Sequence, residues 1–143
     1  MADPLKKLGR YELGRTLGQG AMGVVYEAVD SRLGRTVAIK TIIKSRLEEE
    51  TAKAYTARFQ TEARALAKLN HPNIMQVYDT GDEGDVAYIV MEYLPFGDLK
   101  EQIDKTESFS IKDVIRIMTE LLDALDFAHQ NGVLHRDVKP ANV

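Results

Sequence analysis

Apolar and polar residues alternate over much of the first 92 positions, which is the pattern of half-buried strands. Five segments of this kind are rich in β-branched and aromatic residues, and short turns containing glycine or acidic residues follow several of them. The predicted strands are residues 11–17, 24–30, 36–43, 74–80 and 86–92. Because strands joined by short turns pair antiparallel, the pattern predicts one antiparallel sheet.

A helical segment is predicted between the third and fourth strands. Ser45 followed three residues later by Glu48 fits a capping box, which marks a helix start. Pro72 blocks helical continuation, so we expect the helix to end near residue 69. The positions predicted to form its apolar face are Phe59, Ala63, Leu66 and Leu69.

Helical spacing replaces alternation after Pro95-Phe96-Gly97. Asp98 is placed to cap a short helix. A wide apolar stripe with i, i+3, i+4, i+7 spacing then predicts a long helix from Ser110 to Asn131, where an Asn-Gly pair ends it. The fold class is therefore α+β, with a five-stranded antiparallel sheet and one helix in residues 1–94 and further helices in residues 95–143.

Composition excludes several classes of function. The 143 residues are 44% hydrophobic and carry a formal net charge of −3, so binding to a nucleic acid backbone is not expected. The absence of cysteine excludes disulfides, thiolate metal sites and a cysteine nucleophile. The longest apolar run, Val86–Met91, is far shorter than the roughly 20 residues of a membrane span. We expect a cytoplasmic protein with no membrane segment in this chain.

A glycine cluster lies between the first two predicted strands. Gly18, Gly20 and Gly23 have no side chains, so their backbone could approach phosphate oxygens closely. A flexible hairpin with no ligand is the alternative. A dinucleotide-binding loop would open a helix and carry an acid about 20 residues later, and neither is present here.

Two further groups of residues carry candidate chemistry. Lys40 on the third strand and Glu62 on the helix are plausible partners that could hold phosphate, because a carboxylate on an apolar face needs a cation. The alternatives are a surface lysine with an apolar stem and a solvated Glu62 at the edge of the face. Asp137, Lys139 and Asn142 bring a carboxylate, a cation and an amide into one loop, where they could serve phosphoryl transfer or simply be solvated.

In order and type, these residues resemble the signature set of protein kinases. The set comprises the glycine cluster followed by Val25, then Val37-Ala38-Ile39-Lys40, Glu62, and His135-Arg136-Asp137 with Asn142. The sequences of residues 17–23 and of His71-Pro72-Asn73-Ile74 are most similar to those of the bacterial eukaryotic-like (Hanks-type) serine/threonine protein kinases. The resemblance implies a kinase N-lobe followed by the first helices of a C-lobe, with the boundary between residues 94 and 95.

The resemblance also implies ATP and Mg²⁺ as cofactors and a protein serine or threonine as substrate. The residues it places at the nucleotide are Leu17, Gly18, Gln19, Gly20, Ala21, Met22, Gly23, Val25, Ala38, Lys40, Met91, Glu92, Leu94 and Asp98. Lys40 would hold the α- and β-phosphates and Glu62 would position it. Asp137 would orient the substrate hydroxyl, Lys139 would contact the γ-phosphate and Asn142 would ligate the metal.

The resemblance covers nearly the whole chain but about half of the family's domain. The Asp-Phe-Gly segment, whose aspartate is the main Mg²⁺ ligand, is not among the 143 residues. We therefore expect this polypeptide alone to transfer phosphate poorly, as a piece of a longer kinase that could be membrane-tethered elsewhere. The alternative is a non-catalytic nucleotide-binding or interaction module. The apolar stripe of residues 110–131 would lack its usual covering helices, which predicts that the isolated chain buries it by symmetric self-association or by rearrangement.

Overall fold

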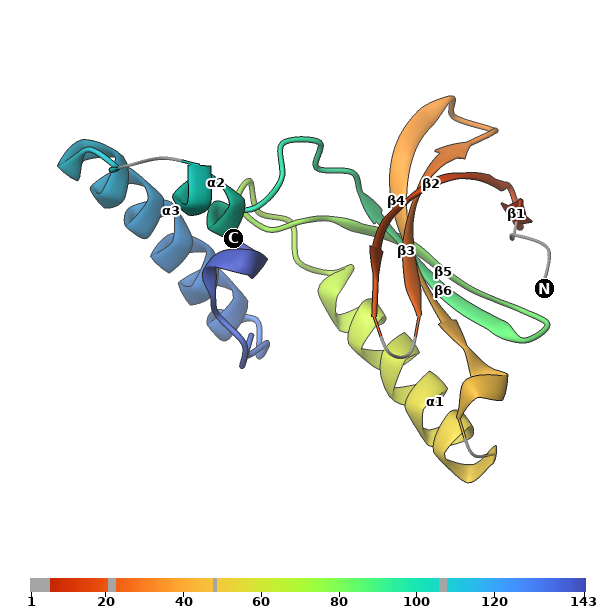
Figure 1. The fold of residues 1–143 in the computed structure, drawn as a ribbon. Helices are drawn as coiled ribbons and strands as arrows, with labels where there is room; N and C mark the ends of the chain where they lie inside the picture. The colour runs from red at the N-terminus through yellow and green to blue at the C-terminus, as the bar shows by residue number, and fades with distance from the viewer. Residues whose placement is uncertain (1–5, 21–22, 48, 106–107) are drawn as a thin grey trace. The chain divides into compact units, whose positions relative to one another are not determined.

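The computed structural model describes residues 6–20, 23–47, 49–105 and 108–143 (Figure 1). The chain forms two compact units, which are described separately. The first unit consists of Met1–Lys68 and Gln76–Tyr93, and the second of Leu69–Met75 and Leu94–Val143. The predicted α+β class is confirmed, and in the described ranges the sheet lies in the first unit and two of the three α-helices lie in the second.

Among its described residues, the first unit has a strongly curled sheet of six antiparallel strands in the order β1-β2-β3-β4-β6-β5 (Figure 1). Its strands are β1 (Lys7–Leu8), β2 (Tyr11–Gln19), β3 (Val24–Asp30), β4 (Arg35–Ile43), β5 (Val77–Glu83) and β6 (Val86–Glu92). The prediction of five strands missed β1, which is two residues long and has no alternation to detect. The predicted strand at residues 74–80 begins later, at Val77.

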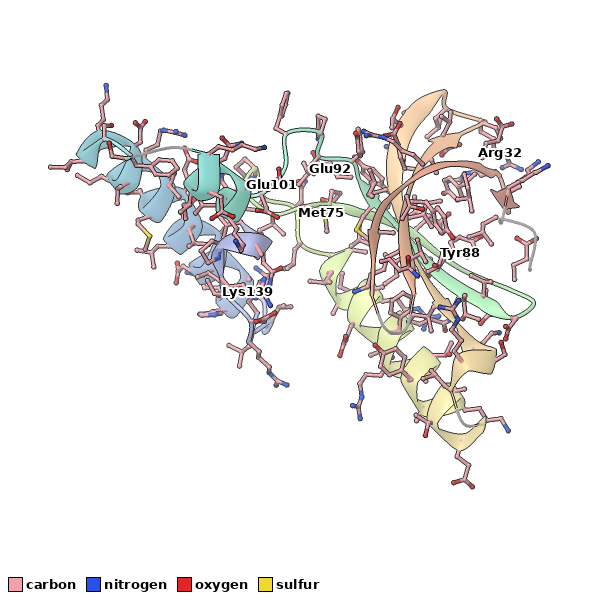
Figure 2. The ribbon with its side chains drawn as sticks, viewed as in Figure 1. Arg32, Met75, Tyr88, Glu92, Glu101 and Lys139 are labelled. Atoms are coloured by element: carbon pink, nitrogen blue, oxygen red, sulfur yellow. The ribbon has the colours of Figure 1, made fainter. Side chains whose placement is uncertain are left out.

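Alternating residues of the central strands build two separate cores, as the period of two requires. Val37 and Ile39 of β4 face the inside of the curl, where they pack with Tyr88 and are fully buried. Figure 2 shows Tyr88 within this curl. Ala38 and Ile42 face the other side, where helix α1 covers the sheet. The pattern of the sequence therefore determines which face of β4 each side chain occupies.

Helix α1 (Glu49–Leu66) follows a short 3₁₀ helix, η1 (Lys44–Arg46), and the predicted capping box is wrong. Ser45 lies inside η1, and its hydroxyl bonds the carboxylate of Asp85, while Glu48 lies outside the described residues. Phe59 and Ala63 are buried against the sheet as predicted. Leu66 is 37% exposed, so it belongs to the margin of the apolar face.

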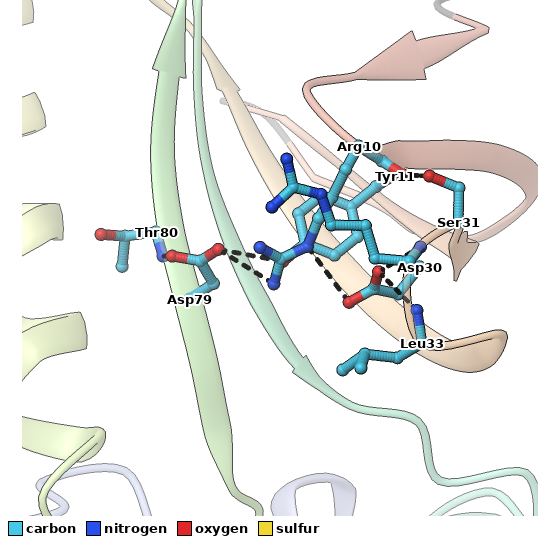
Figure 3. Close-up of polar contacts among 8 residues, drawn as sticks. Arg10, Tyr11, Asp30, Ser31, Leu33, Asp79 and Thr80 are labelled. Atoms are coloured by element: carbon cyan, nitrogen blue, oxygen red, sulfur yellow. Dashed lines mark hydrogen bonds and ion pairs between the residues drawn. The ribbon is translucent and has the colours of Figure 1, made fainter.

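A polar network closes the curl where the start of β2 meets β5 (Figure 3). The guanidinium of Arg10 lies 3.2 Å from Asp30 and 3.5 Å from Asp79. The hydroxyl of Tyr11 donates to Asp79 at 3.0 Å. Burial, reinforced by this hydrogen bond, raises the pKa of Tyr11 to about 12. These contacts join strands that are far apart in the chain, so they stabilise the curled form of the sheet.

The second unit contains helices α2 (Leu99–Lys105) and α3 (Ile111–Gln130) and a terminal 3₁₀ helix, η2 (Pro140–Asn142). Both predicted N-caps are confirmed: Asp98 accepts the N–H of Glu101 at 2.8 Å, and Ser110 accepts the N–H of Asp113 at 3.1 Å. Gly132, with φ of +76°, allows the chain to turn after α3.

Residues 69–75 are held to α3 by a histidine. The ring of His71 lies 5.1 Å from that of Phe127, and its Nε2 is 3.0 Å from the carboxylate of Asp123. The other ring nitrogen accepts the N–H of Asn73, which shapes the loop. The segment that leaves the first unit after α1 is therefore part of the second unit.

Much of the apolar stripe of α3 is exposed in this chain. Ala124 and Ala128 are its buried positions. Its exposed apolar residues are Ile111, Val114, Ile115, Met118 and Leu122, with exposed fractions between 46% and 80%. Within the described ranges, none of the helices has the length and apolar character needed to cross a membrane.

Candidate functional site

The glycine cluster forms the turn between β2 and β3. The N–H of Gly20 donates to the carbonyl of Gly23 at 2.9 Å, which closes the hairpin. Ala21 and Met22 lie outside the described residues. Gly18 has no neighbouring atom within 4 Å of where a Cβ would stand, and the nearest one at Gly20 is 3.9 Å away. These two glycines leave open backbone that a ligand could approach.

Gly23 has a different reason to be glycine. A Cβ at this position would lie 1.7 Å from the backbone oxygen of Thr41, so no side chain fits between the loop and β4. The cluster therefore combines two open positions with one that is required by a close approach of two backbones.

The face of the sheet covered by α1 also carries several predicted nucleotide contacts. Val25 pairs with Lys40, and Ala38 pairs with Met91, in the ladders between β3, β4 and β6. Val25, Ala38 and Met91 share one apolar cluster with Tyr93. Leu17, at the end of β2, is 39% exposed. Residues from three separate segments of the sequence, in β3, in β4 and at the end of β6, thus form one apolar surface next to Lys40.

Lys40 and Glu62 line one small cavity of about 260 Å³, together with Tyr55, Arg58 and Phe59. Both side chains are exposed. In the part of the chain that the structure describes, no ion pair within 4.0 Å joins them. The interpretation of Glu62 as a carboxylate desolvated on the apolar face is therefore wrong. Its place at the edge of α1, beside the cavity, leaves it accessible to water and to Lys40.

Three predicted nucleotide contacts lie at the end of β6 or after it, and two of them make structural hydrogen bonds. The N–H of Glu92 donates to Gln76 at 2.8 Å, and its carboxylate accepts the N–H of Gln76 at 3.2 Å, at the start of β5. Leu94, in the second unit, is 56% exposed. Asp98 uses one carboxylate oxygen to cap α2.

The loop before η2 and the last residue of η2 bring two predicted catalytic groups and the predicted metal ligand together in the second unit. Asp137 Oδ2 lies 2.8 Å from the ammonium of Lys139 and accepts a hydrogen bond from Asn142 at 3.1 Å. The hydrogen bond from Lys139 is the main reason that the pKa of Asp137 lies below its usual value, and Asn142 adds to the effect. Arg136 precedes it with φ of +62°, a backbone conformation that non-glycine residues rarely adopt. Asp137 is therefore ionised at neutral pH and is held by hydrogen bonds from Lys139 and Asn142.

A profile that describes the protein kinase domain matches residues 11–143. The chain belongs to the protein kinase family. A probable serine/threonine-protein kinase of Streptomyces coelicolor is 43% identical to it over 147 aligned residues, which cover the whole chain. PknB of Mycobacterium tuberculosis and PrkC of Bacillus subtilis are each 42% identical, over 100% and 94% of the chain. The chain spans 21%, 23% and 20% of the length of these three relatives, respectively.

Protein kinases generally use ATP with Mg²⁺, and Asn142 is the residue near Asp137 that has an atom suited to bind the metal. The amide nitrogen of Asn142 donates to both the carbonyl and the carboxylate of Asp137, at 2.8 and 3.1 Å. Its amide oxygen is therefore the atom left to face a cation, and oxygen is the ligand that Mg²⁺ prefers. Among the described residues, no group of three or more metal-binding side chains occurs.

Sequence reasoning missed the polar contacts of two residues near the glycine hairpin, Arg15 and Thr41. Arg15 bonds Glu27 at 2.7 Å and the hydroxyl of Tyr93 at 2.9 Å, which ties β2 and β3 to the segment after β6. Thr41 bonds the backbone of Val24. Neither has a local signal, because the partners lie 12–78 residues apart in the chain.

Proposed function

We propose that this chain carries the ATP-binding face and the catalytic loop of a serine/threonine protein kinase. The observation that carries the proposal is the loop in which Asp137 is held by Lys139 and Asn142. A carboxylate, a cation and an amide oxygen are the groups that phosphoryl transfer to a hydroxyl requires. The similarity to relatives named as serine/threonine kinases supports the choice of a protein hydroxyl as acceptor.

In this proposal the first unit binds the nucleotide. Val25, Ala38 and Met91 provide an apolar surface for the adenine. The open backbone at Gly18 and Gly20 covers the phosphates, and Lys40 neutralises their charge. Glu62, beside the same cavity, positions Lys40. On the basis of the resemblance, the other described residues predicted to contact the nucleotide are Leu17, Gln19, Gly23 and Glu92 in the first unit, and Leu94 and Asp98 in the second. The first unit therefore carries most of the proposed contacts.

The second unit carries the chemistry. The ionised carboxylate of Asp137 accepts a hydrogen bond from the substrate hydroxyl and orients it for attack. The Lys139 ammonium stabilises negative charge that develops on the transferred group. Bound Mg²⁺ supplies further neutralisation of phosphate charge, and Asn142 is the residue here that would hold it. With this single metal ligand, the 143-residue polypeptide is expected to bind ATP better than it turns it over.

The test uses two substitutions that separate binding from chemistry. Lys40→Met should weaken ATP binding to the chain by at least about tenfold, since a charge-assisted contact to phosphate is lost. Asp137→Asn, which preserves shape, should leave ATP affinity within about twofold but abolish phosphorylation in any full-length kinase into which this sequence is built. Lys100→Met is the matched control, because Lys100 pairs only with Asp104 on the surface of α2 among the contacts described. Equal ATP affinity in wild type and Lys40→Met would contradict the proposed nucleotide site.

Self-association is a second proposed property, favoured by one observation. The exposed apolar residues of α3 form a row at helical spacing, and Ile111 is 80% exposed. Such a row is unusual on the surface of a monomer. A second copy of the chain is the partner we propose for this row in the isolated polypeptide, and sizing over a dilution series tests it.

A further inference from the structure

Thr41 directly follows Lys40 on β4, but its side chain points to the opposite face of the sheet and is 1% exposed. Its hydroxyl donates to the backbone oxygen of Val24 at 2.8 Å. The hydroxyl oxygen of Thr41 also accepts the N–H of Val24, at 3.2 Å. One buried hydroxyl therefore satisfies both backbone groups of the residue that follows the glycine cluster.

This contact extends the sheet beyond its regular pairing. The ladder between β3 and β4 runs from Asp30 opposite Arg35 to Val25 opposite Lys40. Val24 is the next residue, and it is held by the side chain of Thr41 in addition to its place in β3. Gly23 then crosses the backbone oxygen of Thr41 at the close approach described above. The leg of the glycine hairpin that enters β3 is thus anchored to the strand that carries Lys40.

We propose that Thr41 is a positioning residue for the nucleotide phosphates. The inference rests on the proposed function, since it assigns a role within the same site. Thr41 faces away from Lys40 and acts through Gly23 and Val24, whose backbone it holds. The anchored leg is joined to the open backbone of the hairpin by the hydrogen bond from Gly20 to Gly23. Because Gly18, Gly20 and Lys40 are proposed to meet the phosphates, the anchor sets the distance between the groups that bind the same charge.

The apolar surface proposed for the adenine does not depend on the hydroxyl of Thr41. Val25, Ala38 and Met91 are packed in an apolar cluster on the other face of the sheet from Thr41. Loss of the hydroxyl should therefore leave contacts with the base largely unchanged. A freed hairpin leg must be ordered again when phosphates bind, and ordering a mobile segment reduces affinity. The effect of Thr41 is expected on ATP and not on adenosine.

The experiment compares Thr41→Val, which keeps the shape and removes the hydroxyl, with Thr41→Ser, which keeps the hydroxyl. Thr119→Val is the control, because Thr119 also has a hydroxyl that bonds a backbone carbonyl, at Ile115 in the other unit. Affinities for Mg-ATP and for adenosine are measured on each purified chain by calorimetric titration. Amide hydrogen exchange of Val24 is followed without nucleotide.

Thr41→Val should weaken Mg-ATP binding by about three- to tenfold, the equivalent of one hydrogen bond. Its affinity for adenosine should stay within about twofold, and the Val24 amide should exchange faster. Thr41→Ser should restore both properties, and Thr119→Val should change neither. An unchanged Val24 exchange rate in Thr41→Val would refute the anchor. A parallel loss of ATP and adenosine affinity would show a general structural effect and overturn the assignment to the phosphates.

The proposed function can fail separately. If the wild-type chain binds neither ATP nor adenosine, the nucleotide site is refuted, and the phosphate role of Thr41 is refuted with it. The exchange rate of the Val24 amide would still decide whether the hydroxyl anchors the hairpin.

Discussion

Replacing Gly23 by alanine tests whether the glycine cluster contains one structural position and two open ones. The new Cβ would lie 1.7 Å from the oxygen and 2.8 Å from the carbon of the Thr41 carbonyl, compared with 3.4–4 Å in ordinary contacts. Both neighbours are backbone atoms, so no rotamer change relieves the clash. The hairpin leg must move away from β4, and the hydrogen bonds between Thr41 and Val24 lengthen or break.

The cost can be built from these two effects. Overpacking with a backbone shift costs about 1–3 kcal/mol. Loss of the two bonds at Val24 adds about 1–2 kcal/mol. The free energy of unfolding should therefore fall by about 2–5 kcal/mol, a large part of the roughly 5–15 kcal/mol typical of a domain. Gly20→Ala, whose Cβ would have its nearest neighbour at 3.9 Å, should change it by less than about 1 kcal/mol.

Urea unfolding followed by far-ultraviolet circular dichroism measures both variants against the wild type. The expected result is a clear drop in the midpoint for Gly23→Ala and almost none for Gly20→Ala, with similar slopes. Equal midpoints for the two variants would show that the backbone can part here at little cost. The close approach of Gly23 to β4 would then not be what requires glycine.

Three further outcomes are expected. Burial alone would raise the pKa of Asp30, but hydrogen bonds from backbone N–H groups and the charge of Arg10 outweigh burial and lower it. This carboxylate therefore stabilises the fold above its unfolded pKa of about 3.9, and the stabilisation is lost as the pH falls through the lower folded pKa. Acid unfolding of Asp30→Asn should lack that part of the pH dependence, and an acid unfolding curve equal to that of the wild type would contradict this. Ile115→Glu should reduce the mass measured by light scattering at high concentration, whereas a wild-type monomer throughout would exclude self-association by α3. Ser110→Ala should lower stability by about 1 kcal/mol in thermal unfolding through loss of the N-cap, and no change would mean that the cap is already satisfied by water.

Local sequence patterns predicted most of the strands and helices, because strand alternation and helix capping depend on residues that are close together in the chain. Alternation located the strands from β2 to β6, and the side chains of Asp98 and Ser110 marked the starts of α2 and α3. The capping box at Ser45 failed because a tertiary partner, Asp85, took its hydroxyl. The start of β5 was misplaced because pairing with the end of β6 decides which residues join the sheet.

The candidate site follows the same division. Residue types and their order in the chain identified Lys40, Glu62, Asp137 and Asn142, since the motifs of a family are defined by residue types and by their separation along the sequence. The contacts of Arg15 and Thr41 near the glycine hairpin depend on partners that the sheet brings together, so only the folded structure shows them.

The class of fold, the faces of the central strands and the family can therefore be read from the order of residues, because periodicity and motif order are properties of the chain alone. The tertiary structure decided that Glu62 is exposed, that β1 completes the sheet and that Gly23 has no room for a side chain. Each of these depends on distances between segments separated along the chain, and such distances exist only once the chain has folded.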